Sequence, residues 1–503
     1  MTLLLSGGDR GLHRCKDALH RSAHYLAPTA HLVLRRACPV SKMMRPDRSI
    51  QTGAATSAAA STASSTDRTQ TAIQTEECST SYDLSHSQCP DFLQRKGAFN
   101  SRGQLILKNL SYEELEQWCL QEGERPQRAR QLWRWMYYSG NWIRGPDDTA
   151  GLQDGFSKGF REGLGQRVTM DGQLQLQRTQ VSADGTCKLL FDLRGDGAAG
   201  TVEAVIIPVQ RPNSSRPQRT TLCISSQVGC AQNCQFCLTG RMGLRGNLST
   251  AQIVEQVVEA CRYVASHQAR VASGELPVSQ QIAPITNIVF MGMGEPLHNL
   301  EAVRQSVSIL CHPQGLQFSP NRVTVSTVGL IPEMQALVAS SSAQLAVSLH
   351  ATTDEVRDWI APVNRRYPLQ QLMGALRDLF PKHGSPKQHN GRHVLFEYVM
   401  LQGINDSLED AQRLLMLTHG IECKFNLIGF NPHPGTRFRP STSQQVAAFG
   451  GIIRDAGAVC TVRESRGGDE MAACGQLGHV EAIESVMPLL EPPPQFLDAL
   501  VAA

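Results

Sequence analysis

The sequence predicts an α/β protein built on a partial (β/α)6 barrel, with a small N-terminal helical accessory domain and a disordered N-terminal extension. After residue 220, apolar strand-like runs alternate with helix-like stretches, a pattern typical of a parallel sheet covered by helices. Residues 104–164 carry helical patterns instead, and residues 1–95 are basic at first and then rich in Ser, Thr and Ala. With 503 residues, 41% of them apolar and 18% charged, the chain has room for more than one domain.

The first segment, residues 1–95, is predicted to be a disordered transit peptide. Its first 50 residues hold nine Lys and Arg against three Asp, and a Ser/Thr/Ala-rich stretch follows. Such a composition cannot bury enough apolar surface to fold, and arginines with hydroxyl residues and few acids are typical of organellar targeting. We expect an organellar location, with the chloroplast favoured over the mitochondrion. The alternative is a disordered tail without a targeting signal, in a cytoplasmic protein.

Residues 96–165 are predicted to form the accessory domain. In SYEELEQWCLQEG, Ser111 and Glu114 have the spacing of a capping box at a helix start, and RPQRARQLWRWMYYSG predicts a second helix ending before Gly140. Four of the five tryptophans lie here among arginines. We expect most of the rings to form a core, whereas the arginines fit an RNA-binding face and a plain solvated face equally well. These residues are Trp118, Trp133, Trp135, Trp142, Arg125, Arg128, Arg130, Arg134 and Arg144.

Residues 166–219 predict an antiparallel strand lead-in followed by a connector, because QLQLQRTQV, CKLLFDL and TVEAVIIPV are separated by Asp-Gly turn signals. The barrel is assigned to 220–485 and a C-terminal tail to 486–503. Two polar segments, 266–283 and 381–391, are interpreted as loop insertions. The predicted barrel strands are 221–226, 286–291, 322–327, 343–349, 393–401 and 424–429.

Three of the fifteen cysteines, Cys230, Cys234 and Cys237, lie in one short segment with C-x3-C-x2-C spacing. The total is odd and the others are scattered, which favours a reducing compartment over a disulfide scaffold. A structural zinc ion needs four protein ligands, whereas three cysteines on a [4Fe–4S] cluster leave one iron open. We therefore predict a cluster, at the carboxyl end of the first barrel strand, where such barrels gather their active sites. A zinc site with a distant fourth ligand is the alternative.

The segment MGMGEPLHN follows the second predicted strand, so it lies on the same face. Its glycines let the backbone approach a ligand closely. Glu295, or a backbone carbonyl, could accept a hydrogen bond from a cationic amine. Gly-rich turns after strands are common, so this segment alone is weak evidence for a binding site. Its position one strand–helix unit after the cysteines strengthens that interpretation.

Several segments in order resemble the rRNA/tRNA adenosine-C2 methyltransferases, the RlmN/Cfr class of radical S-adenosylmethionine (SAM) enzymes. The resemblance covers about residues 104–480 and implies a radical SAM barrel. It also implies one [4Fe–4S] cluster per chain, SAM bound to the open iron, and methylation of adenosine C2 in large-subunit rRNA and in tRNA. The segments are TLCISSQVGCAQNCQFCLTG, NIVFMGMGEPLHN, VTVSTVG, LAVSLHA, FNLIGFNPHPG and RGGDEMAACGQL.

The resemblance also assigns roles to single residues. It implies that Cys474 carries the methyl group, that Cys223 resolves the intermediate and that Glu203 accepts a proton. From the residues alone, Cys223 would be a buried strand residue, Cys474 an inert thiol and Glu203 a solvated strand residue. The implied SAM contacts are Gly294, Glu295, Ser326, Ser348, Leu349, His350 and Asn431.

The implied chemistry suits a carbon that is not nucleophilic and therefore resists a polar methyl transfer. The Cys474 thiolate takes a methyl group from one SAM. Reductive cleavage of a second SAM gives a 5′-deoxyadenosyl radical, which removes hydrogen from that methyl group, and the methylene radical adds to C2. After loss of an electron and a proton, Cys223 attacks the Cys474 sulfur, and the methylated base leaves as a disulfide forms.

The expected partners are rRNA and tRNA, together with an electron donor such as ferredoxin or flavodoxin. We expect a monomer with no membrane segment, because the chain has no apolar run of about 18 residues. Two alternatives remain open. An adenosine-C8 methyltransferase of the same class would share these motifs, and a non-catalytic, metal-bearing RNA-binding protein would share the clustered cysteines.

Overall fold

A ten-stranded sheet forms the centre of the protein in the computed structural model, which describes residues 90–95, 97–194, 200–209, 219–382, 392–479 and 487–500. The strand order is β14-β13-β12-β11-β10-β9-β6-β5-β4-β3. Residues 1–89 of the predicted transit peptide (1–95), the connector at 210–218 and most of the segment at 381–391 lie outside the described residues.

Within this sheet, the strands from β6 to β14 run parallel, and all six predicted barrel strands are present. The predicted fold, a partial barrel with a helical N-terminal module, is confirmed. A seventh parallel strand, β14, continues the barrel beyond the prediction. The bounds are β6 (Arg219–Cys223), β9 (Ile285–Phe290), β10 (Val323–Thr327), β11 (Gln344–Ser348), β12 (Val394–Met400), β13 (Cys423–Gly429) and β14 (Cys460–Arg463).

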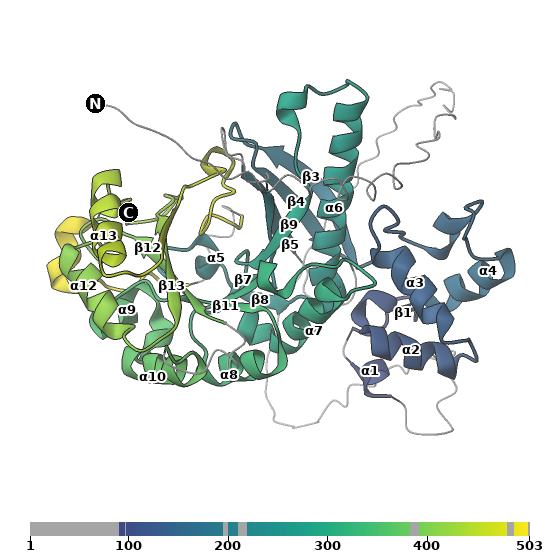
Figure 1. Ribbon diagram of the computed structural model, residues 1–503, viewed down its shortest axis with the longest axis horizontal. Helices are drawn as coiled ribbons and strands as arrows, with labels where there is room; N and C mark the ends of the chain where they lie inside the picture. Colours follow the sequence, from purple (N-terminus) through teal and green to yellow (C-terminus); the bar gives the residue numbers. More distant parts are fainter. Residues whose placement is uncertain are drawn as a thin grey trace, which may run out of the picture. The chain divides into compact units, whose positions relative to one another are not determined.

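Helices cover the outside of these strands (Figure 1). The predicted loop insertion at 266–283 is wrong for residues 266–272, which continue the first of these helices to Ala272, whereas residues 273–283 form a turn and a short 3-10 helix. The residues up to 272 include neither Gly nor Pro, so nothing stops the helix before the turn at Gly274. No described helix is both long and apolar enough to cross a membrane. The bounds are α6 (Thr250–Ala272), α7 (Leu300–Cys311), α8 (Ile331–Ser340), α9 (Asp354–Ile360), α10 (Leu369–Leu379), α12 (Leu408–Leu417) and α13 (Ser443–Asp455).

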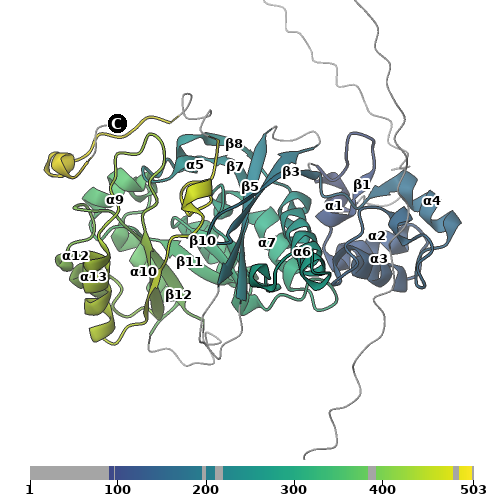
Figure 2. The same cartoon turned by 90° about the horizontal axis from the view of Figure 1, so that it is seen from above.

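The strands of the lead-in are antiparallel, as expected, and they extend the barrel sheet. They are β3 (Leu174–Val181), β4 (Cys187–Leu193) and β5 (Thr201–Val209). Strand β5 pairs with β6, so the antiparallel strands join the first barrel strand directly. Figure 2 shows β3 and β5 between the barrel strands and the accessory helices.

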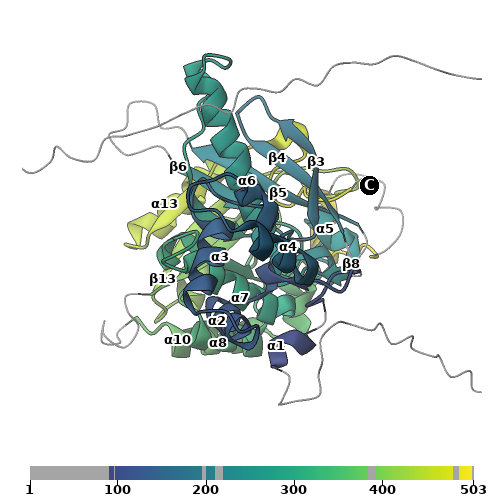
Figure 3. The ribbon, with the colours of Figure 1, turned by 90° about the vertical axis from the view of Figure 1, so that its right-hand side faces the viewer.

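The accessory module is built on four helices, several of which face the viewer in Figure 3. Ser111 and Glu114 form the expected capping box at the start of its second helix. Trp118 and Trp133 are buried in its core, as the ring prediction required, and Val254, Val258 and Ile309 from the barrel helices complete that core. The bounds are α1 (Asp91–Gln94), α2 (Tyr112–Gln121), α3 (Gln127–Tyr137), α4 (Lys158–Arg167), β1 (Leu105–Ile106) and β2 (Val168–Thr169).

Buried charges join this module to α6. The ammonium group of Lys108 is fully buried and forms an ion pair with Glu255. Glu255 also pairs with Arg262, at 3.1 Å between Nη1 and Oε1, and Arg144 of the module binds Glu259 at 2.7 Å. Burial lowers the pKa of Lys108, and the charge of Glu255 opposes that shift. Lys108 thus depends on one carboxylate, whereas Glu255 has two cations.

This asymmetry predicts unequal effects of two substitutions on stability. Glu255→Gln should lower the free energy of unfolding by about 3–5 kcal/mol, because it leaves the Lys108 ammonium buried without a counter-charge. Lys108→Met should cost under about 2 kcal/mol, because Arg262 still compensates Glu255. Urea unfolding followed by circular dichroism measures both. Equal losses in the two variants would contradict this account of the junction.

Candidate active site

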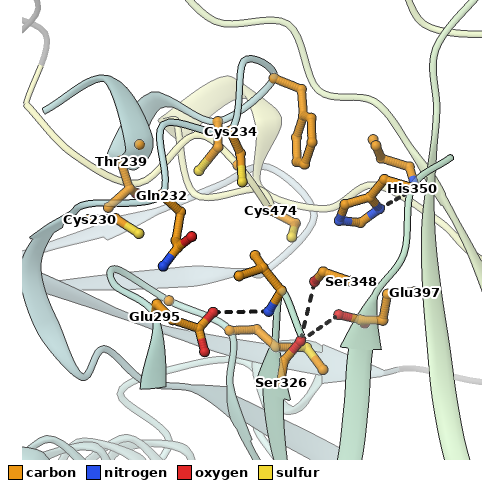
Figure 4. Close-up of a pocket in the computed structure, with 18 of the residues that line it drawn as sticks. Cys230, Gln232, Cys234, Thr239, Glu295, Ser326, Ser348, His350, Glu397 and Cys474 are labelled. Carbon is orange, nitrogen blue, oxygen red and sulfur yellow. Dashed lines mark hydrogen bonds between the residues drawn. The ribbon is translucent and has the colours of Figure 1, made fainter. Parts of the chain in front are cut away.

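A pocket at the carboxyl ends of the parallel strands holds about 950 Å³ of empty space, including the open solvent at its mouth (Figure 4). It brings together most of the predicted site residues: Cys230, Cys234, Cys237, Gly294, Glu295, Ser326, Ser348, His350 and Cys474. The other four predicted residues are absent from its described lining: Glu203, Cys223, Leu349 and Asn431.

The three clustered cysteines line the pocket from the chain segment that follows β6. A two-stranded hairpin of β7 (Gln227–Cys230) and β8 (Gly243–Asn247) carries Cys230 at its first strand's end. Cys237 caps the short helix α5 (Leu238–Arg241). The backbone N–H of Gln235 donates to the carbonyl of Ile360 at 3.0 Å, which ties the segment to the end of α9.

These thiols suit an iron–sulfur cluster by their chemistry. All three are free, and burial raises the pKa of each, so binding metal as thiolates requires release of their protons. Among the described residues, no three His, Cys, Asp or Glu side chains converge on a point that could hold one ion. A [4Fe–4S] cluster takes each thiolate on a different iron, so its ligands need no such convergence. Cys230, Cys234 and Cys237 would hold the cluster.

The glycine turn after β9 has the close backbone packing that the sequence indicates. Gly294 has φ of +103°, and a Cβ atom there would lie 2.6 Å from the Cβ of Gln227. The carboxylate of Glu295 accepts hydrogen bonds from the backbone N–H groups of Leu297 at 3.1 Å and Val328 at 3.0 Å. Burial raises the pKa of Glu295 to about 7. Both oxygens therefore already fix the local backbone, which leaves the carbonyls of the turn as further acceptors for an ammonium group.

Three polar side chains from neighbouring strands form the floor of the pocket. Ser326 at the end of β10 donates to Glu397 of β12 at 3.2 Å, and its Oγ lies 3.5 Å from that of Ser348 on β11. Figure 4 shows the three side chains facing one another. Burial raises the pKa of Glu397, and the Arg463 guanidinium opposes this shift.

His350 is held in one tautomer. Its Nδ1 accepts from the backbone N–H of Val399 at 3.0 Å, so the ring proton lies on Nε2. Burial lowers the pKa of His350 to about 3, and the nearby Arg357 adds to the effect, so the ring is neutral. The backbone is left-handed at His350, with φ of +61°, which is uncommon for a residue other than glycine. The Phe236 ring packs edge-on against the His350 ring, with 4.7 Å between the ring centroids.

Cys474 lies in a segment that we call the strap, residues 467–478. Asn431 donates to the Cys474 carbonyl at 3.0 Å, and the N–H of Leu238 donates to the Gly475 carbonyl at 2.8 Å. The predicted SAM contact Asn431 therefore positions the cysteine segment in this structure. Hydrogen bonds also tie the strap to the end of β3 and to the turn between β3 and β4; they join Gln180 to Glu470, Ala183 to Asp469, and Asp184 to Gly467.

Cys223 ends β6 and lies within electrostatic range of Cys474. Burial raises the pKa of Cys223 to about 12; Arg463 opposes the shift, and the charge of Cys474 adds to it. Burial likewise raises the pKa of Cys474 to about 11, again against Arg463. The positive charge of the Arg463 guanidinium therefore acts on both thiols and opposes the effect of burial. A cation beside two thiols favours their thiolate forms.

Glu203 is 3% exposed, which corrects the solvated position that the residue pattern alone indicates. Its carboxylate lies 3.4 Å from the ammonium group of Lys188 and accepts from the N–H of Gly478 at 2.9 Å. Lys188 also donates to the Met471 carbonyl at 3.4 Å. Glu203 is thus bonded to the strap that carries Cys474. Its role as a proton acceptor stays a prediction.

The sequence analysis missed Lys188, Glu397 and Arg463. Each is a charged residue on a strand, and each is placed by a neighbour far away in the sequence. The usable signal was strongest at Glu397, because it interrupts the otherwise apolar run VLFEYVML. Lys188 and Arg463 stand in mixed-charge surroundings that give no such contrast.

Comparisons with known proteins agree with this site. Residues 224–415 match the Radical SAM superfamily, and residues 106–167 match the ribosomal RNA large subunit methyltransferase N-terminal domain. The crystal structure of a radical SAM methyltransferase from Sphaerobacter thermophilus is 38% identical, with a TM-score of 0.62. That similarity covers 74% of this chain and 98% of the other.

Two curated relatives extend the match over nearly their full lengths. The dual-specificity RNA methyltransferase RlmN of Syntrophotalea carbinolica is 45% identical over 371 residues, which are 74% of this chain and 89% of the relative. The RlmN of Syntrophobacter fumaroxidans is 44% identical over 373 residues, covering 74% of this chain and 98% of the relative. The chain therefore belongs to the RlmN family of radical SAM methyltransferases, and its cofactors are a [4Fe–4S] cluster and SAM.

Proposed function

We propose that this enzyme methylates C2 of an adenosine in large-subunit rRNA and in tRNA, through a methyl group carried on Cys474. The observation that carries the proposal is the position of Cys474, which lines the same pocket as Cys230, Cys234 and Cys237. The relatives named as dual-specificity RNA methyltransferases support RNA as the substrate. A carrier thiol beside the cluster site can receive a methyl group and present it to a base.

The proposal gives the chain's own residues separate tasks. Cys474 holds the methyl carbon, the neutral His350 offers an Nε2–H donor, and Cys223 attacks the Cys474 sulfur to release the product as a disulfide forms. The charge of Arg463 favours the thiolate form of both cysteines. Glu203 receives the proton lost from C2. Cys230, Cys234 and Cys237 would hold the cluster, which would supply an electron for radical chemistry on SAM.

Three further proposals concern the surroundings of the enzyme. A one-electron donor such as ferredoxin or flavodoxin would reduce the cluster, and a thiol reductant would reset the cysteine pair. We propose that the enzyme acts as a monomer. The basic, hydroxyl-rich composition of residues 1–95 supports import into an organelle, for which the chloroplast is our first candidate.

An anaerobic assay of the reconstituted enzyme tests the central proposal. Large-subunit rRNA fragments and tRNA would carry adenine deuterated at C2, and mass spectrometry would locate the methyl group. We expect methylation with loss of the C2 deuteron. Methylated adenosine that keeps this deuteron would favour the C8 alternative, and an inactive, iron-free protein that binds RNA would favour the non-catalytic one.

A further inference from the structure

The C-terminal tail contacts the segment that carries the three clustered cysteines. Its described part, residues 487–500, is drawn in yellow near the C-terminal label in Figure 2. The N–H of Met487 donates to the carbonyl of Arg241, at the end of α5, at 3.3 Å. This is one of three hydrogen bonds between the C-terminal tail and residues 230–241, which we call the cluster loop.

The other two hydrogen bonds lie on either side of a cluster cysteine. The side-chain amide of Asn233 donates to the Pro488 carbonyl at 3.1 Å. The N–H of Leu490 donates to the side-chain oxygen of Gln235 at 2.8 Å. Asn233 and Gln235 are the two chain neighbours of Cys234. The C-terminal tail is therefore bonded to the immediate surroundings of one predicted cluster ligand.

The two side chains that make these bonds are buried and joined to each other. Asn233 is 6% exposed and Gln235 is 1% exposed. The amide nitrogen of Gln235 donates to the backbone carbonyl of Asn233 at 2.8 Å. Asn233 has φ of +50°, in the left-handed region that residues other than glycine adopt rarely. Since a buried amide that loses its partner costs free energy, these bonds favour one conformation of the cluster loop.

The C-terminal tail is also anchored on the barrel, away from the cluster loop. The ring of Phe496 stacks on the ring of Trp359 in α9, with 5.9 Å between the centroids and 19° between the planes. The guanidinium of Arg437 donates to the Leu490 carbonyl at 2.6 Å. These contacts hold the C-terminal tail to the barrel, so it can act as a fixed support for the cluster loop.

The strap holds a different part of the cluster loop. The hydroxyl of Thr239 donates to the Leu477 carbonyl at 2.6 Å, and the preceding Leu238 is bonded to the strap as well. Both residues follow Cys237, whereas the bonds of the C-terminal tail flank Cys234. A [4Fe–4S] cluster needs each thiolate on its own iron, so both parts of the loop must keep their positions.

We propose that the C-terminal tail positions Cys234 for the cluster, acting through Asn233 and Gln235 and independently of the strap. Groups that hold a metal ligand in place commonly decide how firmly the metal is retained. The inference goes beyond the proposed function, because it concerns retention of the cluster and requires neither an RNA substrate nor a methyl carrier. It gives the last described residues of the chain a task.

Loss of iron from the reconstituted holoenzyme tests the inference without turnover. The protein would be mixed anaerobically with the iron chelator ferrozine, without RNA or SAM, and the iron–ferrozine absorbance would be followed. Gln235→Leu and Asn233→Gly should each release iron about 10-fold faster than the wild type. Glycine tolerates the left-handed backbone at position 233, so Asn233→Gly removes the bond without straining the chain. The EPR spectrum of the reduced cluster should change in both variants.

A variant in the C-terminal tail tests whether the tail transmits the effect. Phe496→Ala removes the stacking on Trp359 and leaves every residue of the cluster loop unchanged. It should release iron about threefold faster or more, because the support of the loop is loosened. Phe496→Ala and Gln235→Leu act through the same contact, so the double variant should release iron within about twofold of the rate of Gln235→Leu alone.

Two controls separate positioning from general stability. Gln495→Ala removes an exposed hydrogen bond between the C-terminal tail and Glu355, 2.7 Å long, and should leave the rate of iron release unchanged. Lys108→Met lowers stability at the junction of the accessory module, far along the chain from the cluster loop, and should also release iron at the wild-type rate. Unfolding midpoints of the iron-free proteins show whether each variant folds.

Three results would overturn the inference. Gln235→Leu and Asn233→Gly enzymes that keep the wild-type rate and EPR spectrum would show that these bonds do not position Cys234. Fast release from the loop variants with a wild-type rate in Phe496→Ala would place the effect in the loop itself. Equal acceleration in Lys108→Met would assign it to stability. Each of these results leaves the proposed function intact, and a holoenzyme that retains its iron but methylates no RNA would leave the inference intact.

Discussion

Replacing Cys223 with alanine should leave the enzyme covalently joined to its RNA. Release of the product requires a second thiolate to attack the Cys474 sulfur, and Cys223 lies within electrostatic range of that sulfur. Without this attack, the bond between the carried carbon and adenine C2 persists after the first addition. Denaturing gel electrophoresis should show a protein–RNA band that needs SAM and reductant, and mass spectrometry should place the RNA on Cys474.

A second buried thiol provides the control for this experiment. Cys119 lies in the core of the accessory module and is fully buried. Cys119→Ala also removes a thiol from an apolar core, but it should turn over and leave no adduct. A Cys223→Ala enzyme that stays fully active and free of RNA would show that Cys223 has no part in release.

Replacing Cys474 with alanine should abolish methyl transfer, with a loss of at least about a thousandfold, because the residue forms the covalent intermediate. The three cluster cysteines are unchanged in this variant, so its iron content should equal that of the wild type. SAM cleavage without methylation, measured as release of 5′-deoxyadenosine, can persist at a low level. Methylated RNA from this variant would mean that the methyl group reaches adenine by another path.

The double variant Cys223→Ala/Cys474→Ala separates the two roles. It should form no adduct, because the attachment point is missing, although the releasing thiol is missing too. An adduct in the double variant would place the attachment on another residue. The double variant should also be inactive, because Cys474 acts before Cys223 in the proposed order of steps.

The sequence predicts this site well where one short segment carries the chemistry. The C-x3-C-x2-C spacing and the glycine turn after β9 are local patterns, and both segments line the pocket. The six predicted barrel strands are apolar runs of ordinary length between turn signals, which period-based reasoning detects. Strand β14 escaped because it has four residues at the sheet edge, with little apolar contrast.

Pairings between distant residues could not be predicted in this way. Lys108 and Glu255 are 147 positions apart, and neither stands out from ordinary surface charges in the sequence. From the residues alone Glu203 would be a solvated strand residue, yet it bonds to Gly478 of the strap and lies beside Lys188. Arg463 lies among charged residues in the sequence, and only the tertiary structure pairs it with Ile428 of β13 and brings its charge within range of Cys223 and Cys474. Such positions depend on tertiary packing, which local patterns do not encode.

The strap has a consequence for the entry of a large substrate. The barrel sheet does not close on itself, because its order ends at β14 on one side and at β3 on the other. The strap leaves β14 and reaches the turn between β3 and β4 through side-chain hydrogen bonds such as those of Asp184 and Asp469. The two ends of the sheet are therefore joined at this side by the side-chain hydrogen bonds of the strap and not by paired strands. A large substrate that reaches Cys474 would therefore meet a boundary held by side-chain hydrogen bonds and by the buried Ala472 and Leu477 of the strap.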